Sequence, residues 1–153
     1  MKINKFGIVE KQFEYRGHDC LVVFTHWGVR NGYVSVSLDK NCADYSYKCT
    51  DYSYIDCHGG INFSGELSPD FSPKAKCYIG FDCGHCGDDR DFDTAYKYGL
   101  IDAELRDRRK QDFPHPMYGV VASLEHVESE CKWIVEQLEG NQNECETDNG
   151  FRG

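Results

Sequence analysis

Short stretches in which apolar and polar residues alternate run through the first forty residues and predict β-strands. Phe13–Tyr15 and Cys20–His26 flank a segment that contains Gly17, and this order predicts a hairpin. Val29–Gly32 ends in Asn-Gly, which favours the positive φ angles of tight turns, so a second turn is expected there. The next strand is expected at Tyr33–Leu38, where one face carries Val34, Val36 and Leu38.

The middle of the chain predicts shorter strands separated by glycine and proline. Residues 39–53 show no apolar period and are expected to form a polar loop. Strands are predicted at Tyr54–His58, Ile61–Leu67 and Cys77–Asp82. Gly59-Gly60 separates the first two, and a connection with two prolines precedes the third.

Helical patterns occur only in the last third of the chain. Leu100–Gln111 contains good helix formers and ends before two prolines. A stronger helix signal begins after Ser123, a good N-cap, and is expected to end at Gly140. Its apolar residues recur at helical spacing: Leu124, Val127, Cys131, Ile134, Val135 and Leu138. We therefore predict one α+β domain over residues 1–140, with an antiparallel-rich sheet of about five or six strands, this helix packed on one face, and a frayed acidic tail over 141–153.

Composition narrows the classes of function. The 153 residues carry 17 Lys and Arg against 26 Asp and Glu, a net charge of −9, which argues against direct binding to nucleic acid. The longest apolar run, Cys20–Phe24, is too short for a membrane span, and the N-terminal residues lack the apolar stretch of a signal peptide. We expect a cytoplasmic protein that does not bind membranes.

Nine cysteines are many for a chain of this length. In a reducing compartment most are expected to be free thiols that act as small apolar residues. Two alternatives are disulfides and a structural zinc site, either around Cys83 and Cys86 or among Cys42, Cys49, Cys57 and His58. Cys83-Gly84-His85-Cys86 has the spacing of a redox dithiol, but the acidic residues after it would raise a thiol pKa and disfavour that chemistry.

Polar residues share one face of the two predicted central strands. Asp56 and His58 alternate with apolar residues on the first strand, and Asp82 ends the second. Glycines after each strand expose backbone N–H groups, and Gly80 is expected to leave space beside them. The predicted ligand-binding residues are Asp56, His58, Gly59, Gly60, Gly80, Asp82, His85 and Asp88. The same side chains also suit an ordinary hydrogen-bonded loop cluster, or a Zn or Mn site with mixed nitrogen and oxygen ligands.

The segments IDCHGGINFSGEL, YIGFDCGHCGD and SLEHVESECKWIVEQL, in this order, resemble a group of small hypothetical proteins of bacteriophages and prophages. Those proteins carry D-x-H-G-G and G-F-D-C-x-H-x-x-D before a similar acidic helix. The resemblance covers residues 13–139, does not include Cys86, and implies a phage origin without an established activity. It also implies that the motif positions here are Asp56, His58, Gly59, Gly60, Gly80, Phe81, Asp82, Cys83, His85 and Asp88.

These observations favour a non-catalytic phage accessory protein that binds and neutralises a host factor, with no cofactor. The factor would be a nucleotide-type defence signal in the glycine pocket, or a basic nucleic-acid-binding protein. The latter would dock on the acidic helix, where the expected partner-binding residues are Glu125, Glu128, Glu130 and Glu136. The first alternative is a metal-dependent hydrolase with His58, Asp82, His85 and Asp88 as ligands and Asp56 as a base. The second is a structural homo-oligomer.

Overall fold

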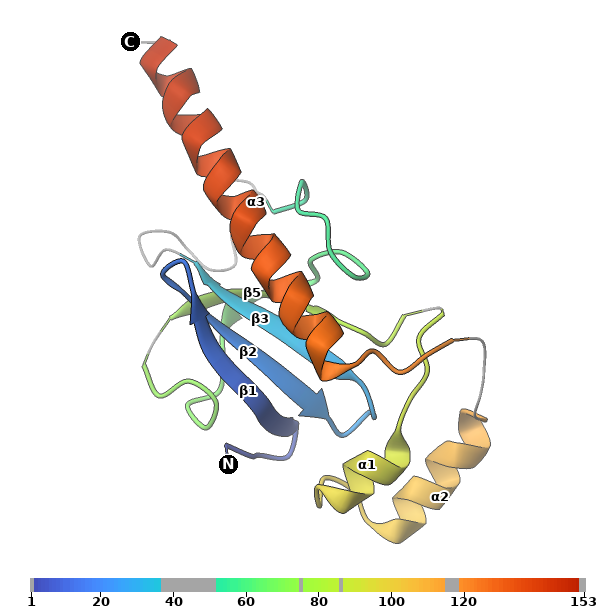
Figure 1. Cartoon of the computed structure of the whole chain (residues 1–153). Coiled ribbons are helices and arrows are strands. Elements are labelled where there is room, and N and C mark those ends of the chain that lie inside the picture. The colour runs from blue at the N-terminus through green and yellow to red at the C-terminus, as the bar shows by residue number, and fades with distance from the viewer. Residues whose placement is uncertain (1, 37–51, 75, 86, 115–118, 152–153) are drawn as a thin grey trace.

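The computed structural model describes residues 2–36, 52–74, 76–85, 87–114 and 119–151, with side chains described up to residue 140 (Figure 1). The predicted strand at Tyr33–Leu38 and the predicted loop 39–53 fall partly outside these ranges. Cys42, Cys49 and Cys86 lie outside them entirely.

A five-stranded antiparallel sheet forms the centre of the described chain. Its strands are β1 (Gly7–Tyr15), β2 (His18–Thr25), β3 (Arg30–Val36), β4 (Phe63–Glu66) and β5 (Cys77–Asp82), in the order β1-β2-β3-β5-β4. Every neighbouring pair is antiparallel. With one long helix packed on the sheet, this confirms the predicted α+β class.

The first hairpin is confirmed, and the second turn lies elsewhere than predicted. Arg16 and Gly17 both have positive φ, as a tight two-residue turn between β1 and β2 requires. The next turn ends at Gly28, whose φ is +76°, and β3 already begins at Arg30. Asn31-Gly32 is therefore part of a strand. A Cβ on Gly32 would lie 2.5 Å from the Phe81 ring, so this glycine permits close packing instead of a turn.

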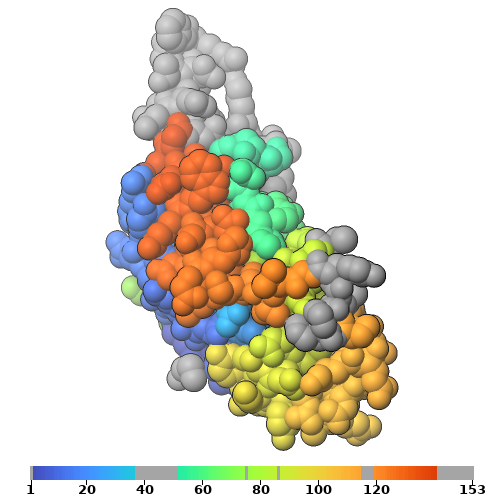
Figure 2. Space-filling view, turned by 45° about the vertical axis from the view of Figure 1, so that its right-hand side comes forward, coloured from blue at the N-terminus to red at the C-terminus, as the bar shows by residue number. Residues whose placement is uncertain are grey.

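The segment before β4 also differs from the prediction. Tyr54–His58 is not a strand, and the described part of the predicted Ile61–Leu67 strand that pairs is Phe63–Glu66. Gln137 accepts a hydrogen bond from the backbone N–H of Asp56 at 2.7 Å and donates one to its carbonyl at 2.7 Å. Residues 54–58 therefore lie along the C-terminal helix that contains Gln137, and Figure 2 shows them as part of the teal surface beside that helix.

Three helices follow the sheet: α1 (Phe92–Lys97), α2 (Ala103–Asp112) and α3 (Leu124–Phe151). The predictions of α2 and α3 are confirmed, whereas α1 was not predicted. Ser123 accepts a hydrogen bond from the N–H of His126 at 3.1 Å, as expected of an N-cap. Gly140 does not end α3, which continues to Phe151 and extends beyond the sheet (Figure 1).

Apolar side chains cover both faces of the sheet. On one face, Ile79 and Phe81 pack against the predicted stripe of α3, including Val127 and Ile134. On the other face, Tyr78 is 1% exposed and packs with Phe71 from the connection before β5. The expectation that this face of the strands collects the polar residues, with space beside Gly80, is therefore wrong. The polar residues collect at the end of β5 and in the loop that follows it.

Candidate functional site

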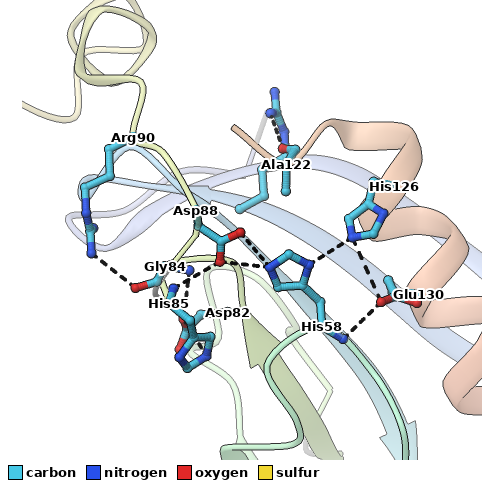
Figure 3. Close-up of polar contacts among 10 residues, drawn as sticks. His58, Asp82, Gly84, His85, Asp88, Arg90, Ala122, His126 and Glu130 are labelled. Atoms are coloured by element: carbon cyan, nitrogen blue, oxygen red, sulfur yellow. Dashed lines mark hydrogen bonds and ion pairs between the residues drawn. The ribbon is translucent and has the colours of Figure 1, made fainter. Parts of the chain in front are cut away.

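A histidine and an aspartate from separate loops form the centre of the polar cluster (Figure 3). His58 Nε2 lies 2.8 Å from each carboxylate oxygen of Asp88. The Asp88 side chain is 8% exposed and also accepts a hydrogen bond from the N–H of His85 at 3.0 Å. A carboxylate only accepts hydrogen bonds, so Nε2 of His58 carries the proton. In the neutral ring, Nδ1 then carries the lone pair that accepts a hydrogen bond or binds a metal ion.

The lone pair of His58 faces two side chains of α3. Nδ1 of His58 lies 3.0 Å from Nε2 of His126. Nε2 of His126 in turn lies 3.9 Å from Oε1 of Glu130. Glu130 Oε1 also accepts a hydrogen bond from the backbone N–H of His58 at 2.9 Å, which fixes the loop against the helix. His126 and Glu130 are four residues apart and therefore share a face of α3.

These three side chains have the chemistry and spacing of a metal-ligand set. Their ligand atoms, one each from His58, His126 and Glu130, lie within 4.8 Å of one another. Two ligands of a tetrahedral zinc ion are about 3.3–3.4 Å apart, given metal–ligand bonds of about 2.0–2.1 Å. The observed 3.0 and 3.9 Å lie on either side of that value. Asp88 contacts the far nitrogen of His58, the contact that a carboxylate commonly makes with a metal-bound histidine.

A second histidine–aspartate pair lies beside this set. His85 Nε2 is 3.2 Å from Asp82 Oδ1, which also accepts a hydrogen bond from the N–H of Gly84 at 3.0 Å. A Cβ on Gly59 would lie 2.2 Å from the His85 ring, so only glycine allows the ring to come this close to the loop of His58. The His85 side chain is 42% exposed and is therefore accessible to a reactant.

The structure brings four of the predicted side chains together and leaves others out. His58, Asp82, His85 and Asp88 form the cluster, with Gly59 at the contact between the two loops. The predicted pocket over paired strands is wrong, because the residues meet through loops. Asp56 instead hydrogen-bonds through its backbone to Gln137, and Gly60 closes the turn by donating to the carbonyl of Cys57.

Gly80 does not provide space for a ligand. A Cβ at this position would lie 2.5 Å from the Tyr33 ring and 2.8 Å from the carbonyl oxygen of Gly32. The space beside Gly80 is thus filled by the neighbouring strand, β3. The expectation of a gap there is wrong because the face that carries Gly80 and Tyr78 is the second core face.

His126 is a site residue that the sequence interpretation missed, and Glu130 was assigned to a different role. The available signal was the i, i+4 spacing of a histidine and a glutamate near the start of a predicted helix. That spacing is common on solvated helices, so it gains meaning only when His58 is placed opposite. The predicted strand faces did not supply that placement.

The glutamates predicted to bind a partner make contacts within the chain. Glu128 lies 2.8 Å from Nζ of Lys11 and 3.4 Å from Nζ of Lys132, which lowers its pKa. Glu136 accepts a hydrogen bond from the Tyr15 hydroxyl at 2.7 Å. Glu125 is exposed, and its backbone carbonyl accepts from the Ser129 hydroxyl. A partner surface on this helix stays a prediction.

The described thiols are poor nucleophiles. Cys20, Cys57 and Cys83 are free, and burial raises the pKa of each to about 12. Cys131 is also free and buried against the sheet, and Cys77 is disulfide-bonded. Thiolate chemistry at neutral pH is therefore disfavoured at these four free positions.

A cavity of about 470 Å³ is lined in part by Asp82 at the end of β5 and by Gly84 in the loop that follows. Its walls include the rings of Phe6, Trp27 and Phe113 and the side chain of Arg90. Asp82 lines the cavity too and also contacts His85, so it connects the cavity to the histidine cluster.

No protein-family model, curated protein or solved structure matches the chain. The resemblance to phage proteins therefore stays a prediction. None of the helices in the described part of the chain is both long enough and apolar enough to cross a membrane.

Proposed function

We propose that the protein is a metal-dependent hydrolase whose divalent ion, Zn²⁺ first among the candidates, is held by His58, His126 and Glu130. The observation that carries this proposal is the contact of Asp88 with the far nitrogen of His58. In the neutral ring this contact places the proton on Nε2 and leaves Nδ1, which points at α3, as the nitrogen able to bind a metal ion. In the absence of a metal ion, the same tautomer lets Nδ1 of His58 accept a hydrogen bond from Nε2 of His126 at 3.0 Å, and a metal ion would replace that proton between the two rings.

The reaction class follows from the number of ligands. Catalytic zinc sites characteristically have three protein ligands and one position for water, whereas structural sites are closed by four. The pKa of a metal-bound water falls to about 7, which makes hydroxide available at neutral pH. A metal ion held by these three side chains would thus supply a nucleophile for hydrolysis of an ester or a phosphodiester.

His85 is the residue that we assign to proton transfer. Asp82 orients its ring, and the contact with Gly59 places it beside the loop of His58. This assignment changes the earlier ligand hypothesis. Of the four ligands predicted from the sequence, only His58 keeps that role. Asp88 orients His58, and Asp82 and His85 form the acid–base pair.

The neutralisation of a host factor remains an alternative proposal, but the contacts favour the metal site. Of the four glutamates that would meet a partner, Glu128, Glu130 and Glu136 hydrogen-bond within the chain. Their charges are thereby directed at residues of this protein instead of outward.

The proposal is tested by zinc binding and hydrolysis measured on the same variants. The full chain is titrated with Zn²⁺ in competition with a chromogenic chelator, and about one equivalent is expected to bind. His126→Ala and Glu130→Gln should weaken binding by about tenfold or more, because each removes a direct ligand. His85→Ala is the matched control, since it removes a histidine from the same cluster and should leave zinc affinity unchanged.

Hydrolysis is then followed with p-nitrophenyl esters and phosphodiesters. His85→Ala should bind zinc but lose most of the activity, whereas His126→Ala should lose both. Failure of the wild-type protein to bind zinc or manganese would refute the proposal. Equal zinc affinity in the His126→Ala and His85→Ala variants would refute the ligand assignment.

A further inference from the structure

The cavity beside Trp27 is a second site, separate from the metal ligands. We propose that it binds a nucleoside monophosphate, with the base against the indole of Trp27 and the phosphate at Arg90. The ligand would therefore combine a planar ring that carries N–H groups with an anionic group. This inference is independent of the proposed hydrolase activity, because none of its arguments uses His58, His126 or Glu130.

Aromatic rings form the walls of the cavity. Phe6 and Trp27, with Phe113, line a volume of about 470 Å³, within the range of small-molecule sites. Trp27 is 43% exposed and Phe6 is 40% exposed, which leaves large apolar surfaces in contact with water. Stacking a planar base on such rings is favourable and depends little on which base is present.

One arginine lines this cavity and a second lies beside it, although the protein is acidic overall. The Arg90 guanidinium donates to the carbonyls of Trp27 and Gly84 and lies 4.9 Å from the centre of the Phe113 ring. Arg109 lies over one face of the Trp27 ring, 4.1 Å from its centre, and donates to the carbonyl of His26, so the base would stack on the ring surface that Arg109 leaves open. Within the described residues, neither arginine forms an ion pair with a carboxylate, despite 26 acidic residues in the chain.

The two arginines also act on each other. Burial lowers the pKa of Arg109, and the nearby charges of Arg108 and Arg90 lower it further. Both arginines also contact Trp27, Arg90 through the backbone carbonyl and Arg109 over the ring. An anion in the cavity would relieve this repulsion and would accept charge-assisted hydrogen bonds from Arg90.

A buried hydrogen-bond acceptor in the cavity wall matches the N–H groups of the base. Asn31 lines the cavity, and its Nδ2 donates to the Tyr33 hydroxyl at 3.0 Å. Its Oδ1 is buried and has no hydrogen-bond partner among the described residues. An unsatisfied buried acceptor is costly, and the N–H groups of a base supply the missing donor. Asp82, the carboxylate of the wall, already accepts hydrogen bonds from Gly84 and Asn62.

Binding is measured by the fluorescence of Trp27 in a Trp133→Phe background. Trp133 is the other tryptophan of the chain, is exposed on α3 and does not line the cavity. AMP, GMP, CMP and UMP are titrated with EDTA present, so that binding through a metal ion makes no contribution. A saturable change in Trp27 emission is expected with at least one of them, because the base would lie on the indole.

Ligand fragments separate the parts of the proposal without altering the protein. Removing the phosphate, as in adenosine or its counterparts, should weaken binding by about tenfold or more, since the contact with Arg90 is lost. Inorganic phosphate alone should not change the emission. Indole-3-acetate combines a ring, an N–H and a carboxylate, and it should bind more weakly than the best nucleotide.

A matched pair of arginine variants tests the assignment of the phosphate. Arg90→Gln should weaken nucleotide binding by about tenfold. Arg106→Gln makes the same change of charge at an arginine that also stacks on an aromatic ring, Tyr96, but does not line the cavity, so affinity should not change. The proposal is overturned if no nucleotide alters the emission, if nucleosides bind as tightly as their monophosphates, or if indole-3-acetate binds more tightly. The nucleoside comparison remains decisive even where Arg90→Gln fails to fold.

Discussion

The substitution Asp88→Asn tests whether the polar cluster is arranged for a metal ion. Asparagine has nearly the same shape, but its amide presents one acceptor and one NH₂ donor where the carboxylate presents two acceptors. Asp88 receives hydrogen bonds from two different groups, Nε2 of His58 and the backbone N–H of His85. In either orientation the amide NH₂ would meet a donor: Nε2–H of His58 if it takes the place of Oδ1, or both N–H groups if it takes the place of Oδ2.

The size of the effect follows from these contacts. The hydrogen bonds involve a charged acceptor that is 8% exposed, and such bonds contribute about 1.5–3 kcal/mol each. We therefore expect the free energy of unfolding of the metal-free protein to fall by about 1–3 kcal/mol. Loss of the carboxylate that orients a metal-bound histidine costs about 10–100-fold in metal affinity, or about 1.4–2.7 kcal/mol.

Two measurements separate these effects. Urea denaturation of the metal-free variant gives the change in stability, and chelator competition at a temperature where the variant is folded gives its zinc affinity. His18→Ala is a suitable control, because His18 bonds the carbonyl of Ser35 at 2.7 Å and is absent from the cluster.

The reasoning predicts a loss of both stability and zinc affinity in Asp88→Asn. A folded variant with unchanged zinc affinity would show that Asp88 does not orient a ligand, and the cluster would then be a structural hydrogen-bond network. An unchanged stability in the absence of metal would contradict the hydrogen-bond arrangement itself.

Three further predictions concern the fold around the sites. Gly80→Ala should destabilise the protein by about 1–3 kcal/mol in urea denaturation, because the new methyl group meets the buried Tyr33 ring; no loss would contradict the packing of β3 on β5. Glu10→Gln should cost about 3 kcal/mol in the same assay, because it breaks the largely buried pair with Arg30; a loss well under 1 kcal/mol would refute that pairing. Burial lowers the pKa of His26, and a neighbouring arginine lowers it further, so its contribution to stability is complete above pH 6.5 and is lost as pH falls through the folded pKa; an NMR titration midpoint at or above 6.5 would contradict this.

The helix α3 shows how much of the fold was predictable from local pattern. Its apolar stripe predicted both the helix and the face that packs on the sheet, and Val127, Cys131 and Ile134 are fully buried there. The hairpin at Arg16-Gly17 was predictable for a similar reason, because positive φ is a local requirement. In both cases the information lies within a few neighbouring residues.

The position of Gly32 shows where local reasoning failed. Asn-Gly has the same sequence whether it forms a turn or lies within a strand, and the deciding contact is the ring of Phe81, nearly fifty residues away. Gly80 is the same case, since its space is taken by Tyr33. Sequence alone indicates that a side chain is missing, but not which neighbour requires it to be missing.

The sequence by itself determined the antiparallel α+β class, the face of α3 that is buried, and most of the polar residues that cluster. Periodicity and glycine spacing are local properties, and they are sufficient for these conclusions. Tertiary structure alone decided that His126 and Glu130 stand opposite His58, and that Trp27 and Arg90 share a cavity. Each of those pairs is far apart in the chain, so its geometry depends on how loops and helix pack, for which no short sequence pattern carries the information.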